Sequence, residues 1–198
     1  MKVFLADVSA LCDGDLSPWL DRLPPGRRAY AERYKKTVDR ACAAVGLLLV
    51  ARELCGIDPC YVPGEWTIGE RGRPSLDGSP LHFSLSHADG LCAAVASGTP
   101  IGLDVERIRP LRAALLPRFC TPEEIKRCRH DPALAVALWT KREARAKENG
   151  RGIGQNLVSL TTEGVTTVTV TAGGRAFALS YTASEPAETV WLEPQELL

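Results

Sequence analysis

The chain has 198 residues, of which 45% are hydrophobic and 24% are charged. This composition is that of an ordinary globular protein, and it excludes a disordered, collagen-like or coiled-coil chain. The 24 Lys and Arg residues balance the 24 Asp and Glu residues, so no bulk charge attracts nucleic acid or an anionic membrane. Recognition of a phosphate must therefore depend on a few placed residues.

The predicted elements of the N-terminal half are, in chain order, a strand over residues 3–8, a helical face over 16–23, an apolar helix from about 38 to 56, and a hairpin with arms at 83–86 and 93–95. Pro24-Pro25 ends the first helix, and a basic stretch over residues 27–40 leads into the second. A linker rich in Gly and Pro, residues 64–80, precedes the hairpin, which turns at Asp89-Gly90.

The predicted elements of the C-terminal half are a strand over residues 101–106, a short helix from 121, a longer helix over 131–149, and strands over 157–160, 165–171, 175–181 and 190–192. Thr121-Pro122 and Asp131-Pro132 are N-cap signals, and Gly150 is a stop signal. Each half supplies a helix or two and about three strands, which predicts two similar α+β lobes.

The seven cysteines are an odd number, and they are scattered through apolar segments. Cys55 with Cys60, and Cys120 and Cys128 with His130, suggest metal binding, but neither group has the paired CxxC pattern of structural zinc. Buried, reduced thiols in a cytosolic protein are the favoured interpretation.

No targeting or membrane segment is expected. Asp7 interrupts the N-terminal apolar residues before a signal peptide forms. The longest apolar run, residues 41–51, falls short of the ~20 residues that span a bilayer. We therefore expect a cytoplasmic protein that binds neither membrane nor nucleic acid.

Two carboxylates follow each other at alternate positions of one predicted strand. Residues two apart on a strand point the same way, so Asp104 and Glu106 lie side by side on its polar face. A divalent cation relieves the repulsion, and an all-oxygen pair suits Mg²⁺. The alternative is that both acids simply face solvent, and for an isolated pair this alternative is favoured.

The helix over residues 138–148 places an aromatic, an acid and a base on one stripe. Trp139, Glu143 and Lys147 follow each other at intervals of four residues. Glu143 suits a third metal ligand and Lys147 a phosphate contact, whereas the alternative is a routine surface ion pair. Ser86 and His87 precede a tight turn, where a polar side chain is readily exposed to a ligand.

Several common catalytic patterns are missing from the sequence. It contains no Ser/His/Asp triad pattern, Walker loop or dinucleotide fingerprint, since the glycines over residues 150–154 follow a helix instead of opening one.

The order and spacing of these pieces resemble the 4'-phosphopantetheinyl transferases, of the compact two-lobed type that activates the carrier domains of synthetases. Four blocks carry the resemblance: Gly72-Arg73-Pro74, Phe83 to His87, Pro100 to Glu106, and Leu138 to Ala144 running on to Lys147 and Gly150-Arg151-Gly152. The match is looser in the N-terminal arginines, and the last forty or so residues match only in strand character.

The resemblance implies an α+β fold of two similar lobes related by a pseudo-twofold axis, each a small antiparallel sheet packed on helices. The lobes would be residues 1–99 and 100–198, with the metal site in the second and coenzyme A (CoA) at their interface. The implied activity is Mg²⁺-dependent transfer of phosphopantetheine from CoA to a serine of an apo acyl or peptidyl carrier protein, which releases adenosine 3',5'-bisphosphate. A monomer serving fatty acid, polyketide or nonribosomal peptide synthesis is implied.

The resemblance also assigns roles to individual residues. Asp104, Glu106 and Glu143 would hold Mg²⁺ on the CoA pyrophosphate. Lys147 would bind phosphate oxygens and favour departure of the leaving group, and Glu143, or a water that it orients, would accept the serine proton. The remaining predicted contacts to the CoA phosphates are Arg27, Arg40, Arg73, Ser86 and His87.

The chain departs from the family pattern at four positions. Arg142 and Arg73 each replace a frequent Lys, Ala88 replaces the second serine of an SHS triplet, and Tyr30 lies where a basic contact is often found. These changes leave the three acids and Lys147 intact, so an active enzyme is expected. The alternative is a degenerate module that binds CoA or a carrier protein without transfer.

Overall fold

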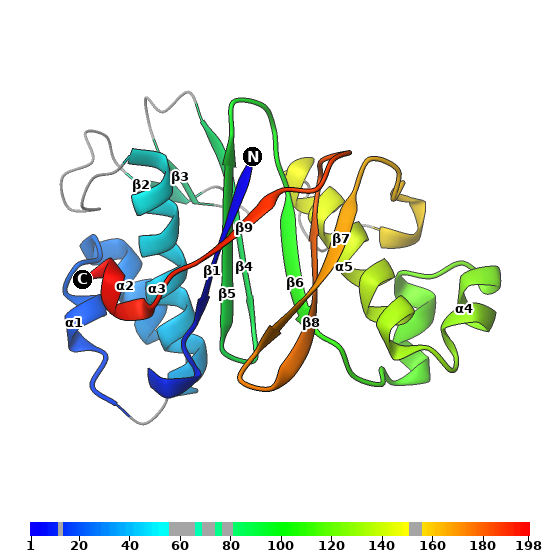
Figure 1. Ribbon diagram of the computed structural model, residues 1–198, viewed down its shortest axis with the longest axis horizontal. Coiled ribbons are helices and arrows are strands. Elements are labelled where there is room, and N and C mark those ends of the chain that lie inside the picture. Colours follow the sequence, from blue (N-terminus) through cyan, green and yellow to red (C-terminus); the bar gives the residue numbers. More distant parts are fainter. Residues whose placement is uncertain (12–13, 56–65, 69–73, 77–80, 151–155) are drawn as a thin grey trace.

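The computed structural model describes residues 1–11, 14–55, 66–68, 74–76, 81–150 and 156–198. Two sheets lie side by side in the middle of the molecule, with one group of helices outside each (Figure 1). The helices are α1 (Ser17–Leu20), α2 (Pro25–Glu32), α3 (Thr37–Cys55), α4 (Pro122–Cys128) and α5 (Pro132–Glu148), with short 3-10 turns η1 (Ser9–Leu11), η3 (Ala113–Arg118), η4 (Leu157–Ser159) and η5 (Pro194–Leu197).

The first sheet has the strand order β4-β5-β1-β9, and the second has the order β6-β8-β7. The strands are β1 (Lys2–Asp7), β4 (His82–Ala88), β5 (Leu91–Ser97), β6 (Leu103–Arg107), β7 (Thr166–Ala172), β8 (Arg175–Tyr181) and β9 (Glu188–Trp191). All neighbours are antiparallel except β1 and β9. The α+β class predicted from the sequence is confirmed.

Strand alternation divides the core into layers. Val3 and Leu5 of β1 pack with Leu103 and Val105 of β6, in a core shared by the two sheets. Ala6, which follows Leu5, faces the other way, into a core with α1, α2 and α3. Helix α3 is buried along its middle turns, which explains its apolar sequence. The layers are therefore helix, sheet, sheet and helix, with α5 on the outer side of the second sheet.

Local signals set several element ends as predicted. Asp89 and Gly90 both have positive φ, 45° and 92°, as the tight turn between β4 and β5 requires. Thr121 and Glu124 form a reciprocal capping box at the start of α4, and Asp131 accepts the Leu134 N–H at the start of α5. These caps satisfy amides that the first turns leave without partners.

Three expectations need correction. Residues 157–160 are not a strand: Leu157–Ser159 is a 3-10 turn, because the Asn156 side chain accepts the Val158 N–H. The linker at 64–80 contains two short paired strands, β2 (Trp66–Ile68) and β3 (Pro74–Leu76). The basic stretch that begins at Arg27 overlaps α2, a separate helix that starts at Pro25.

The C-terminal segment returns to the first sheet, where β9 pairs with β1. The division of the chain at residues 99 and 100 stays a prediction. Cys42, Cys92, Cys120 and Cys128 are free and buried. Within the described ranges, no helix has both the length and the apolar character needed to traverse a bilayer.

Candidate active site

The candidate site lies where β4 of the first sheet meets β6 of the second. These two edge strands run side by side in Figure 1. Ser84 and Ser86, two apart on β4, both reach across to β6: Ser84 Oγ accepts the Leu103 N–H at 3.0 Å, and Ser86 Oγ donates to Asp104 Oδ1 at 2.8 Å. The alternating serines therefore join the two sheets and orient Asp104.

Helix α5 brings a cation to the same carboxylate. Lys147 Nζ lies 2.8 Å from Asp104 Oδ1 and 3.4 Å from the carbonyl oxygen of Leu85. The Lys147 side chain thereby connects α5 to both sheets, and Ser86 donates to the same oxygen from the other strand. Lys147 therefore forms a partly buried ion pair with Asp104, and its charge also lowers the pKa of Glu143, so its role goes beyond a routine surface pair with Glu143.

The charge of Asp104 acts electrostatically on the other two predicted acids, Glu106 and Glu143. Burial, followed by the Asp104 charge, raises the pKa of Glu143 to about 7. The same two causes raise the pKa of Glu106 to about 7. Within the described part of the chain, both carboxylate oxygens of Glu143 and Oδ2 of Asp104 are buried without a hydrogen-bond partner. Nearby cations, Lys147 among them, lower both of these pKa values, but burial and the Asp104 charge dominate.

The chemistry of these donors fits Mg²⁺. All are carboxylate oxygens, which a hard cation prefers, and the orphaned oxygens of Glu143 and Asp104 have unused acceptor capacity. In the described ranges, however, no three Asp, Glu, His or Cys side chains converge as a ready metal cluster. The metal-ligand role of Asp104, Glu106 and Glu143 therefore stays a prediction.

A second group of predicted residues lies on α2, the start of α3 and β4. The Arg27 guanidinium stacks 4.5 Å from the centre of the Tyr30 ring, and the Tyr30 hydroxyl lies 3.0 Å from that of Tyr34. Arg40 donates to the Tyr34 carbonyl at 3.1 Å, and the His87 ring meets the Tyr34 ring edge-on at 5.9 Å. We call these five residues the arginine–tyrosine cluster.

Arg27 in this cluster is buried with unused donors. Arg27 is only 5% exposed, and burial lowers the pKa of its guanidinium. Among the described residues, its Nε and Nη1 have no hydrogen-bond partner, and neither does Nε of Arg40. Buried guanidinium donors without an acceptor favour an anionic ligand.

The structure separates two residues that the sequence placed at one site. Ser86 and His87 are adjacent on β4 and so point to opposite faces. Ser86 contacts Asp104, whereas His87 contacts Tyr34 in the arginine–tyrosine cluster. Arg73 lies outside the described residues.

Residues 100–191 match the model of the 4'-phosphopantetheinyl transferase superfamily. The chain is 30% identical over 175 residues to the 4'-phosphopantetheinyl transferase psf-1 of Bacillus pumilus, an alignment that covers 81% of this chain and 74% of that protein. The chain belongs to the 4'-phosphopantetheinyl transferase superfamily. The family and the enzyme class predicted from the sequence are confirmed.

Two further phosphopantetheinyl transferases are similar over shorter segments. A 4'-phosphopantetheinyl transferase of Bacillus subtilis is 25% identical over 136 residues, which cover 64% of this chain and 60% of the relative. The transferase gsp of Aneurinibacillus migulanus is 28% identical over 129 residues, with coverages of 61% and 53%.

The Arg142 departure of this phosphopantetheinyl transferase has a structural explanation. The guanidinium of Arg142 donates to the Phe119 carbonyl and, at 3.0 Å, to both carboxylate oxygens of Glu124. Glu124 also accepts the Thr121 N–H at the start of α4. Arg142 thus ties α4 to α5 from within.

Some residues of the site gave no signal in the sequence. Tyr34 joins Arg40 to His87, yet its position on the chain marks it only as one more aromatic residue. Arg109 lowers the pKa of Glu106 and Arg118 that of Glu143, against the dominant effect of burial. A count of charges along the loop between β6 and α4 could have singled out these two arginines.

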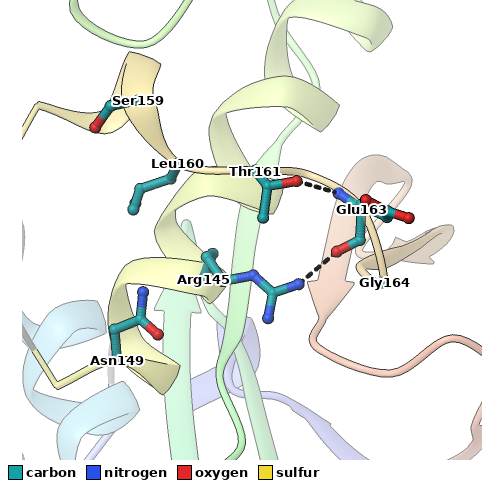
Figure 2. A pocket seen from close by; sticks show the side chains of 7 residues that line it. All are labelled: Arg145, Asn149, Ser159, Leu160, Thr161, Glu163 and Gly164. Carbon is teal, nitrogen blue, oxygen red and sulfur yellow. Dashed lines mark hydrogen bonds between the residues drawn. The ribbon is translucent and has the colours of Figure 1, made fainter.

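A hollow of about 550 Å³ lies away from these carboxylates, between α5 and the segment after η4 (Figure 2). Two charged residues, Arg145 and Glu163, line it, and Arg145 donates to the Glu163 carbonyl and pairs with Glu148. Because Arg145 follows Glu143 by two residues, it projects from a different side of α5. This hollow is separate from the candidate active site.

Proposed function

We propose that this phosphopantetheinyl transferase moves the 4'-phosphopantetheine arm of CoA to a serine of an apo carrier protein and releases adenosine 3',5'-bisphosphate. The observation that carries the proposal is the place where β4 meets β6, which we call the seam. There Asp104 and Glu143, whose carboxylate has no hydrogen-bond partner among the described residues, lie with Lys147. Asp104, Glu106 and Glu143 would hold Mg²⁺, which when bound reduces the negative charge that an attacking serine oxygen meets at the pyrophosphate.

The residues of the seam have distinct tasks in this proposal. Lys147 binds the phosphate oxygens and stabilises the negative charge of the departing bisphosphate. Glu143, or a water that it orients, accepts the proton of the carrier serine. Ser86 holds Asp104 Oδ1 in place, so its contribution to CoA binding is indirect.

The arginine–tyrosine cluster supports binding of the CoA phosphates away from the reacting bond. Among the described residues, Arg27 and Arg40 have buried donors without acceptors, and His87 on β4 contacts Tyr34 of the same cluster. Ser86 and His87 lie next to each other on β4, so one CoA molecule that contacts both faces of this strand would lie along the boundary of the proposed lobes. We infer the pseudo-twofold pair of lobes, residues 1–99 and 100–198, with CoA between them.

The carrier partner is proposed to be acidic near its serine. Arg109 and Arg118 are exposed, and both act electrostatically on the carboxylates of the seam. Complementary charge there would steer an acyl or peptidyl carrier protein toward the reacting phosphate. We propose that the enzyme acts as a monomer in the cytoplasm, for fatty acid, polyketide or nonribosomal peptide synthesis.

Incubation of the protein with CoA, Mg²⁺ and a panel of apo carrier proteins tests this proposal. Mass spectrometry should show one phosphopantetheine added to a carrier, with an equal amount of adenosine 3',5'-bisphosphate released. Glu143→Gln should abolish both products, and Glu123→Gln, an exposed acid on α4, is the matched control that should retain them. Addition of EDTA should stop the reaction, and excess Mg²⁺ should restore it.

Two results would contradict the proposal. CoA binding without modification of any carrier would identify a binding module that lacks transfer activity. Full activity of Glu143→Gln would remove the carboxylate from the reaction.

A further inference from the structure

Three hydroxyl groups form a chain beneath α5, on the second sheet. Ser180 Oγ lies 2.7 Å from Thr140 Oγ1 of α5 and 2.7 Å from Thr167 Oγ1 of β7. Thr140 Oγ1 also donates to the Ala137 carbonyl at 3.2 Å. Thr140 and Ser180 are fully buried, at 0% exposure, so the chain lies inside the packing between helix and sheet.

The number of hydroxyl protons determines which group donates in each hydrogen bond of this chain. Each hydroxyl has one proton to donate, and three hydroxyl groups make three contacts. The Ala137 carbonyl can only accept, so Thr140 donates to it. Ser180 must then donate to Thr140, and Thr167 to Ser180. This is the one assignment that satisfies all three contacts.

The chain connects the two elements that carry the candidate acids. Ser180 pairs directly with Asp104 across β8 and β6, and with Thr167 across β8 and β7, so the three side chains share one face of the sheet. Thr140 lies three residues before Glu143, hence on the same side of α5. The hydroxyl chain therefore ties the turn that presents Glu143 to the row of the sheet that presents Asp104.

The proton count also bears on the carboxylate oxygens that have no hydrogen-bond partner among the described residues, which are Oδ2 of Asp104 and both oxygens of Glu143. Every hydroxyl proton of the chain is used within it, and none is left for Asp104 Oδ2 or for Glu143. A hydroxyl that donated to these oxygens would occupy their acceptor capacity. The chain thus positions the two acids and leaves them available for another ligand.

We propose that Thr140 and Ser180 are positioning residues, whose hydroxyl chain sets the placement of Glu143 over Asp104 for phosphopantetheinyl transfer. The inference rests on the proposed function. Neither residue is among the predicted contacts to Mg²⁺ or CoA, so both act through the helix and the strand that they join. A displacement of a reacting group by about 1 Å is enough to lower a rate by roughly 100-fold.

Steady-state kinetics of four variants test this inference. Thr140→Val keeps the shape of the side chain and removes its hydroxyl, Thr140→Ser keeps the hydroxyl, and Ser180→Ala cuts the chain at its centre. Thr166→Val is the matched control on β7, because the Thr166 hydroxyl donates to the Ala183 carbonyl and takes no part in the chain. Assays are run well below the unfolding temperature of each variant, measured by circular dichroism.

Thr140→Val and Ser180→Ala should lower kcat by about tenfold or more while KM for CoA changes by less than about twofold. Thr140→Ser should restore kcat to near the wild-type value, and Thr166→Val should leave kcat unchanged. If the folded Thr140→Val protein has the wild-type kcat, the inference is wrong although the transferase proposal stands. If the wild type itself transfers nothing to any carrier, the proposed function fails first.

Discussion

Gly102 lies where the strand of the candidate site comes closest to α5, and an added methyl group there should be costly. A Cβ built on Gly102 would lie 1.8 Å from the carbonyl oxygen of Ala144 and 2.6 Å from the amide nitrogen of Glu148. Both atoms belong to the backbone of α5, so no side-chain rotation relieves the contact. We therefore predict that Gly102→Ala separates β6 from α5.

The size of the effect follows from these distances. Ordinary contacts of a Cβ begin near 3.4 Å, so the strand or the helix must move by about 1.5 Å. The strand resists because Gly102 donates to Thr182 Oγ1 and accepts the Thr182 N–H, both at 3.0 Å. Overpacking of this kind costs about 1–3 kcal/mol. The cost should reach the upper end of this range, because the added methyl group meets backbone atoms that cannot rotate away.

Urea unfolding and transfer assays measure the two consequences. Gly102→Ala should lower the free energy of unfolding by about 3 kcal/mol, and kcat should fall by about 100-fold, because Lys147 no longer reaches Asp104. Gly46→Ala is the control: nothing lies within 4 Å of its Cβ position in α3, so alanine should stabilise by about 0.5–1 kcal/mol. A Gly102→Ala protein within 0.5 kcal/mol of wild type would refute this close approach.

Two further predictions concern buried charge. Because burial and Asp104 raise the pKa of Glu143 to about 7, from 4.5, the folded protein holds a proton that the unfolded chain has lost; the free energy of unfolding should fall as the pH rises from about 4.5 to 7. Urea titrations without divalent ions should show this fall, reduced by roughly 2 kcal/mol in Glu143→Gln, and an unchanged slope in that variant would contradict the assignment. Arg142→Met should lower the free energy of unfolding by about 1–3 kcal/mol, because the Phe119 carbonyl and the Glu124 carboxylate both lose the guanidinium that donates to them; Arg127→Met, at an exposed position of α4, should change it by less than about 0.5 kcal/mol in the same assay.

Much of the local structure was predictable because it depends on neighbours in the chain. The alternation at Asp104 and Glu106 predicted a strand with one polar face, and Asp89-Gly90 predicted a turn with positive φ at both residues. The N-caps at Thr121 and Asp131 placed the starts of α4 and α5. The strand predicted over residues 157–160 was wrong. Their apolar composition suited a strand, but the Asn156 side chain accepts a backbone hydrogen bond from Val158 and stabilises a 3-10 turn.

The sequence by itself determined which residue types lie at which spacing, and these were enough to predict the transferase family and the three candidate acids. Only the tertiary structure decided that β4 and β6 meet at an edge, that Lys147 pairs with Asp104, and that Ser86 and His87 diverge to separate clusters. The need for glycine at position 102 and the hydroxyl chain at Ser180 also appear only when α5 lies on its sheet. Most of these contacts join residues far apart in the sequence, such as Ser84 and Leu103, 19 positions apart, and Asp104 and Lys147, 43 positions apart. The periodicity of a sequence predicts which face of an element is apolar, but not which element packs against that face.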